Sequence, residues 1–141
     1  MIYLPDVNIW IALTSDRHIH HPVATEWFRS IDADTIAFCR VTELGFLRLL
    51  TNAHVMGRDV LSPGHAWRTY DAWRTDDRVV FLSEQANFTE HWRRLGSQIT
   101  GGANAWTDAY LATFAAHVDL TVVTLDRQFS HFGEVTVTVL L

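Results

Sequence analysis

The chain has 141 residues, of which 48% are apolar, and a formal net charge of −5. This length fits one domain with its own hydrophobic core, and the apolar content is too high for a disordered chain. The sequence has no apolar run of membrane-spanning length and no basic start of a secretory signal, and its lone Cys39 excludes an intramolecular disulfide, so we expect a cytoplasmic protein.

The acidic charge argues weakly against a nucleic-acid partner, because phosphate binding normally needs a basic face. The argument weakens if several of the acids belong to a cation site. All eleven Lys and Arg positions are Arg. Arg forks onto phosphate and stacks on bases better than Lys does, but a coding bias toward Arg explains the same composition equally well.

Short apolar runs alternate with helical patterns along the chain. In order, we expect a strand at 2–4, a helix at 9–13, a polar loop at 14–22, a helix at 22–31, a strand at 35–39, a helix at 42–51, a loop at 52–61, a helix at 63–74, a strand at 79–82, a helix at 88–95, a loop around 101–102, a helix at 107–118, a strand at 120–125, a connector at 127–133 and an edge strand at 135–140. This alternation predicts an α/β fold in a single domain over 1–141, with a parallel five-stranded sheet flanked by helices on both faces.

Carboxylates interrupt the apolar pattern at four places that the predicted topology brings to one edge of the sheet. Asp6 follows the first strand, which Pro5 closes, and Asp126 follows the fourth strand. Glu43 lies in the first turn of the helix that follows the second strand, and Asp108 lies in the first turn of the helix that precedes the fourth. Ligands bind at the carboxyl ends of the strands in open α/β sheets, so we expect these acids to converge there.

Both helical acids lie on the apolar side of their helices. Glu43 is in phase with Leu47, and Asp108 is in phase with Leu111. A preference of helix N-termini for acids explains either residue alone, but explains four acids at one edge less well. Unpaired carboxylates would raise each other's pKa, and a hard divalent cation such as Mg²⁺ or Mn²⁺ relieves that repulsion.

Four short blocks of sequence carry a resemblance to a known family. They are Asp6-Val7-Asn8, Thr42-Glu43-Leu44-Gly45-Phe46-Leu47-Arg48, Thr107-Asp108-Ala109-Tyr110-Leu111-Ala112 and Thr124-Leu125-Asp126-Arg127-Gln128-Phe129. In this order and spacing they resemble the signature blocks of PIN-domain ribonucleases. The chain, from residue 1 to about 140, looks most like the VapC toxins of bacterial VapBC toxin–antitoxin pairs.

The resemblance implies endonucleolytic cleavage of RNA that depends on Mg²⁺, or on Mn²⁺ as a substitute, with metal-activated water attacking a phosphodiester. It assigns the catalytic and metal-binding acids and their two polar supports to Asp6, Glu43, Asp108, Asp126, Asn8 and Thr124. It also implies a homodimer and a VapB-like antitoxin whose C-terminal segment covers the active-site groove. Arg48 is a candidate contact for RNA or antitoxin, and an exposed solubilising role explains it as well.

Other interpretations stay open. Asp16, His18, His20 and His21 form a dense polar cluster, but their spacing matches no helical zinc pair. The acids would also suit a catalytically silent, cation-binding interaction module. A phosphohydrolase with Asp6 as covalent nucleophile usually has a second acid two residues later, where this chain has Asn8.

Overall fold

The computed structural model describes residues 1–117, 119–129, 132–133 and 135–141. Their elements, in chain order, are β1 (Ile2–Pro5), α1 (Val7–Thr14), α2 (His21–Ser30), β2 (Thr35–Phe38), α3 (Arg40–Leu50), α4 (Ala53–Met56), η1 (Gly57–Asp59), α5 (Pro63–Arg74), β3 (Val79–Phe81), α6 (Phe88–Gly96), α7 (Ala105–His117), β4 (Leu120–Thr124) and β5 (Thr136–Val139).

The five strands form one parallel sheet in the order β3-β2-β1-β4-β5, which confirms the predicted fold class. β1 and β4 are central neighbours, and Pro5 pairs with Val123 at the carboxyl end of both strands. β5, with its alternating Val and Thr, lies at an edge as expected. Because every strand is parallel, the segments that follow β1, β2 and β4 all leave from the same edge of the sheet.

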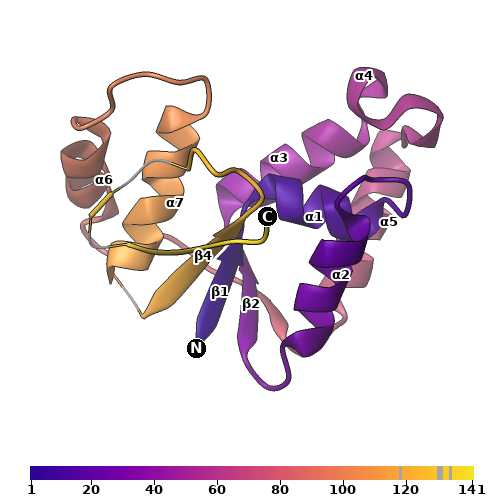
Figure 1. Cartoon of the computed structure of the whole chain (residues 1–141), viewed down its shortest axis with the longest axis horizontal. Coiled ribbons are helices and arrows are strands. Elements are labelled where there is room, and N and C mark those ends of the chain that lie inside the picture. The colour runs from indigo at the N-terminus through magenta and orange to yellow at the C-terminus, as the bar shows by residue number, and fades with distance from the viewer. Residues whose placement is uncertain (118, 130–131, 134) are drawn as a thin grey trace.

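Helices cover both faces of the sheet and form two apolar cores (Figure 1). α1, α2, α3 and α5 build the first core, whereas α6 and α7 build the second. Successive strand residues alternate between the cores: Phe38 contributes to the first and Ala37 to the second, and Val123 and Val122 divide in the same way. Within the described residues, no helix has both the length and the apolar character that a membrane span requires.

Aromatic side chains fill the first core. Trp10 stacks on Phe38 with ring centroids 3.9 Å apart, and Tyr70 meets Phe38 edge-on at 4.8 Å. The Trp73 indole also packs against Trp10 and donates to the Thr14 hydroxyl at 2.9 Å. By contrast, the Trp67 side chain is 50% exposed, so the aromatic face of α5 is divided between the core and the surface.

Several predicted boundaries were wrong, and local capping explains the starts of α3 and α4. The predicted loop at 52–61 contains α4 and η1, and α4 begins where the Asn52 side chain accepts from the His54 N–H. α3 begins at Arg40 because the Thr42 hydroxyl sits one turn inside the helix and accepts from the Cys39 N–H at 3.0 Å. α7 begins at Ala105, ahead of Thr107. Val118 and positions 130–131 of the predicted connector lie outside the described residues.

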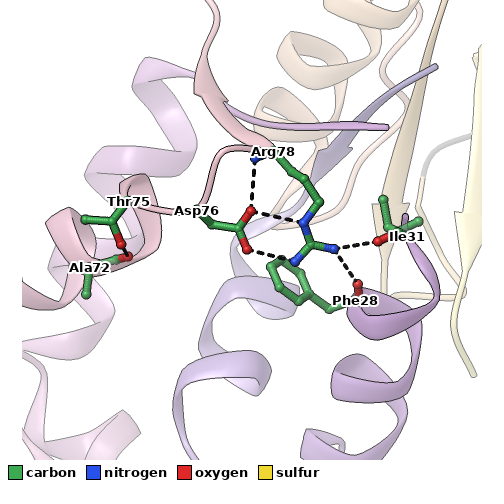
Figure 2. A network of polar contacts seen from close by, with 6 residues as sticks. All are labelled: Phe28, Ile31, Ala72, Thr75, Asp76 and Arg78. Carbon is green, nitrogen blue, oxygen red and sulfur yellow. Dashed lines mark hydrogen bonds and ion pairs between the residues drawn. The ribbon is translucent and has the colours of Figure 1, made fainter. Parts of the chain in front are cut away.

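A network around Arg78 fastens the end of α2 to the turn before β3 (Figure 2). The guanidinium forks onto Asp76, with Nε and Nη2 donating at 3.0 and 2.8 Å to its two oxygens. Nη1 donates to the carbonyls of Phe28 and Ile31 at 3.0 and 2.6 Å, where α2 ends. The guanidinium also lies 4.3 Å from the centre of the Phe28 ring. Only a planar fork can make all of these contacts at once.

We predict that Arg78→Lys lowers the free energy of unfolding by about 1–3 kcal/mol, because an ammonium cannot fork onto Asp76 and also reach both carbonyls. The measurement is urea denaturation followed by circular dichroism. Arg29→Lys, an exposed change in the last turn of α2, serves as the matched control and should shift stability by less than about 0.5 kcal/mol. Equal losses in the two variants would contradict this role for the Arg78 network.

Candidate active site

Asp6 is fixed at the junction between β1 and α1. Its backbone N–H donates to the Val123 carbonyl at 2.8 Å, which extends the β1–β4 pairing by one residue. Its side chain caps α1, with Oδ1 accepting from the Val7 N–H at 2.7 Å. The carboxylate is therefore held at the carboxyl edge of the sheet by both the strand and the helix that it joins.

The Thr124 hydroxyl ties Asp6 to the end of β4. It donates to Asp6 Oδ2 at 3.3 Å and accepts from the Asp126 N–H at 3.1 Å and from Asn8 Nδ2 at 3.3 Å. One donor and two acceptor positions are the full capacity of a hydroxyl. The Asn8 Oδ1 accepts from the Leu125 N–H at 3.2 Å, so both ends of this amide are engaged. We call these four residues, Asp6, Asn8, Thr124 and Asp126, the Thr124 junction.

The Thr124 junction brings two acids into electrostatic contact. Burial is the main cause of a raised Asp6 pKa, and the nearby Asp126 charge adds to it. The hydrogen bonds from Val7 and Thr124 act in the opposite direction. Asp126 is half-buried, and its Oδ1 accepts from the Gln128 N–H at 2.8 Å. The Asp6 carboxylate is therefore less easily ionised than a free one.

Glu43, in the first turn of α3, has partners of its own. It is 8% exposed, and its Oε1 accepts from the Arg40 guanidinium one turn earlier. Tyr70 of α5 also contacts Glu43, and burial and this hydrogen bond raise the pKa of the Tyr70 hydroxyl. That hydroxyl also accepts from Arg74 Nη1 at 3.0 Å. Glu43 is thus a buried carboxylate held between α3 and α5.

A glycine allows α3 to approach α1 at this edge. A Cβ on Gly45 would lie 2.7 Å from Val7 Cγ2, closer than side chains pack. Val7 is the first residue of α1, directly after Asp6, and Gly45 lies two residues after Glu43. The missing Cβ therefore lets the helix that carries Glu43 pack against the start of the helix that Asp6 caps.

The other two predicted residues, Asp108 and Arg48, lie at opposite ends of their helices. Asp108 is 5% exposed in the first turn of α7, and its N–H donates to the Asn104 carbonyl at 2.9 Å. α7 packs on β4 and runs back along the sheet toward the start of that strand (Figure 1). Arg48 is exposed in the last turn of α3, whereas Glu43 is in the first, so the structure does not bring Arg48 to the acids.

The described residues, 1–117, 119–129, 132–133 and 135–141, contain no group of three or more His, Cys, Asp or Glu side chains arranged to hold a metal ion. This includes the cluster before α2, where the His18 and His20 rings lie 5.7 Å apart and the His21 ring bonds to the Ala12 carbonyl. At the carboxyl edge, Asp6 and Asp126 lie together while Glu43 is engaged by Arg40. A cation shared by all four acids stays a prediction.

Two residues of this site were missed in the sequence. Arg40 lies three positions before Glu43, which is a helical ion-pair spacing, and this signal was available. Tyr70 had no local signal, because its contact with Glu43 joins two helices that are distant in the chain.

We predict that Thr124→Val destabilises the protein by about 1–3 kcal/mol, because it leaves the Asp126 N–H and the Asn8 amide without their acceptor while conserving volume. Thr121→Val on the same strand is the control. The Thr121 hydroxyl is also buried but contacts the Met1 sulfur at 3.9 Å, a weak acceptor, so its loss should cost less than about 0.5 kcal/mol. Chemical denaturation of both variants measures the difference, and similar losses would show that the Thr124 junction contributes no special stability.

Comparisons with known proteins agree with this architecture. The sequence model of the PIN domain matches residues 3–135. Ribonuclease VapC41 of Mycobacterium tuberculosis is 38% identical over 135 residues, which cover 92% of each chain.

Solved structures share the fold at lower identity. VapC20 of Mycobacterium tuberculosis, described as a sarcin–ricin loop cleaving toxin, superimposes with a TM-score of 0.71 at 19% identity, over 96% of this chain and 99% of that one. A toxin–antitoxin complex from Klebsiella pneumoniae gives a TM-score of 0.69 at 18% identity, over 99% and 98% of the two chains. By sequence and by fold, the chain belongs to the PIN domain family and, within it, to the VapC ribonucleases.

Proposed function

We propose that this protein is an endoribonuclease toxin of a type II toxin–antitoxin pair and that it uses Mg²⁺, or Mn²⁺ as a substitute, to cleave phosphodiester bonds. The observation that carries the proposal is the Thr124 junction, where one hydroxyl holds Asp6 and the backbone of Asp126 together at the carboxyl edge of the sheet. The 38% identity with a relative named as a ribonuclease supports the reaction class.

The donor chemistry at this edge fits a hard cation. The site offers carboxylate oxygens, and burial, together with the Asp126 charge, raises the pKa of Asp6, which a bound cation would counteract. Asp6 and Asp126 would hold the ion, with Glu43 and Asp108 as further carboxylates. A bound Mg²⁺ supplies positive charge for the phosphate transition state and lowers the pKa of a coordinated water.

The chain's own residues position these groups. Thr124 fixes the orientation of Asp6, and Asn8 fixes Thr124, so the carboxylate needs little reorganisation when substrate binds. Arg40 has a side chain that is 70% exposed beside Glu43. In this proposal Arg40 neutralises a substrate phosphate, and Glu43 then becomes free to bind the ion or to orient the attacking water.

The proposed partners are an RNA substrate, a VapB-like antitoxin and a second copy of the chain. The antitoxin is supported by the fold shared with solved VapBC and toxin–antitoxin complexes. An Arg from such a partner would complement the acidic site in place of the cation. The resemblance to VapC toxins suggests the homodimer, and the lone, buried Cys39 suits a reducing cytoplasm.

We predict that RNA cleavage requires Mg²⁺, stops in EDTA, and falls by at least about 100-fold in Asp6→Asn and Asp126→Asn, because each variant removes a charge from the ion site. The assay follows fragments of a structured RNA on denaturing gels. Asp77→Asn makes the same change at an exposed position before β3, at the opposite edge of the sheet, and should retain activity.

Cleavage that survives EDTA or Asp6→Asn would contradict this mechanism. A folded protein that binds Mg²⁺ without cleaving RNA would instead favour the silent binding module. A phosphoenzyme formed on Asp6 would favour the phosphohydrolase.

We also predict that Asp6→Asn raises the melting temperature of the metal-free protein by a few degrees at pH 7. Folding raises the Asp6 pKa above its ordinary value of 3.8. The wild type therefore loses stability as the pH rises from below 3.8 through the pKa that Asp6 has in the folded protein. Asn lacks this titration and still caps α1. The difference in melting temperature between Asp6→Asn and the wild type should therefore shrink toward zero below about pH 4.

Thermal scans with and without Mg²⁺ measure both effects, with Asp77→Asn as the control. Added Mg²⁺ should stabilise the wild type more than Asp6→Asn, because the ion binds the folded wild type more tightly. If Mg²⁺ raises the melting temperature of Asp6→Asn as much as that of the wild type, the ion binds elsewhere.

A further inference from the structure

A cavity opens at the same edge of the sheet, where β3 ends. Its volume is 230 Å³, and its lining residues are Arg40, Phe81, Leu82, Ser83, Glu84 and Tyr110. The backbone at its base is fixed by the sheet, because the Leu82 N–H donates to the Phe38 carbonyl at 2.8 Å. Sites for drug-sized ligands are typically roughly 300–1,000 Å³, so this cavity suits a single planar ring system.

Arg40 connects this cavity to the candidate active site. Its guanidinium pairs with Glu43 and also lies 4.7 Å from the centre of the Phe81 ring. One wall of the cavity is therefore a π face with a cationic plane over it. Aromatic rings and Arg planes are the surfaces on which unpaired nucleobases stack.

The polar end of the cavity presents a carboxylate. The Tyr110 hydroxyl donates to Glu84 Oε2 at 2.8 Å, and Tyr110 itself is only 5% exposed. Burial raises the pKa of Tyr110, so it stays protonated and remains a donor. Glu84 is exposed, and a carboxylate has about four acceptor positions, so one bond from Tyr110 fixes its orientation and leaves other positions open.

We propose that this cavity binds a guanine base of single-stranded RNA beside the scissile phosphate, with the Arg40 guanidinium, which is supported by the Phe81 ring, contacting its face and Glu84 its Watson–Crick edge. Guanine presents two adjacent donors there, N1–H and the N2 amino group, which match the two oxygens of a carboxylate. Uracil presents one donor between two carbonyls, which a carboxylate repels. A second guanidinium, as from a peptide arginine, would be repelled by Arg40. This inference deepens the proposed ribonuclease function and rests on it for the choice of RNA.

The test uses nucleosides, which lack the phosphate that the nearby acids would repel. Guanosine, inosine and uridine are titrated into the metal-free full-length protein, and backbone amide shifts are followed by NMR. We expect guanosine to shift the amides of residues 81–84 and to bind about tenfold more tightly than inosine, which lacks the N2 amino group, or uridine. Shifts confined to other residues, no shifts, or equal affinities for the three nucleosides would overturn the proposal.

Two conservative variants separate the contacts. Glu84→Gln can still accept from Tyr110 but lacks the charge, and should abolish the preference for guanosine over inosine. Phe81→Leu keeps an apolar side chain without the π face, and should weaken binding of all three nucleosides. Glu26→Gln, an exposed change on α2, is the matched control and should behave as the wild type. If Glu84→Gln still binds guanosine more tightly than inosine, Glu84 is not the group that recognises the N2 amino group.

The nucleoside titration does not require cleavage, so the two proposals fail separately. Guanosine binding without Mg²⁺-dependent cleavage would overturn the ribonuclease proposal alone. The cavity proposal alone would be overturned by two results together. No nucleoside binds, and RNAs that differ at one neighbouring base are cleaved equally whether or not that base is guanine.

Discussion

The arrangement of the acidic edge depends on the pairing of β1 with β4 and on the hydroxyl at the end of that pair. The pairing brings Asp6 and Thr124, which are 118 residues apart in the chain, to the same edge of the sheet. Thr124 then uses its donor and both acceptor positions to join the two strand ends and α1. With an apolar side chain at this position, the strands could still pair, but Asp6 would be oriented by the Val7 N–H alone.

The same arrangement carries an electrostatic cost. Asp6 is desolvated and faces the charge of Asp126, and both effects raise its pKa. The chain offsets part of the local negative charge with Arg40, which pairs with Glu43 one turn into α3. The Arg40 side chain is mostly exposed, so it can reach a partner in solvent, whereas Glu43 is buried. Carboxylates kept together in this way cost stability, and a bound cation, as proposed, would offset that cost.

The sequence predicted the parts of the molecule that depend on periodicity and strand ends. Asp6 and Asp126 were identifiable because each follows an apolar strand, and the buried state of Glu43 followed from its phase with Leu47. The sequence did not predict α4, because its four residues depend on a cap from Asn52 and not on apolar spacing. Likewise, the contacts of Tyr70 with Glu43 and of Val7 with Gly45 arise from helix packing, which no local pattern encodes.

Arg40 links the two proposals through a competition between partners. In this conformation it pairs with Glu43 and covers Phe81, and its long side chain ends in water. A phosphate that enters between the acids and the cavity beside Phe81 offers the guanidinium a stronger, bidentate partner than a single carboxylate oxygen. Once Arg40 turns to that phosphate, the Glu43 carboxylate is left without its ion-pair partner at the moment when a cation is needed. We therefore expect cation affinity to rise when RNA is bound and RNA affinity to rise equally when the cation is bound, because such coupling is reciprocal.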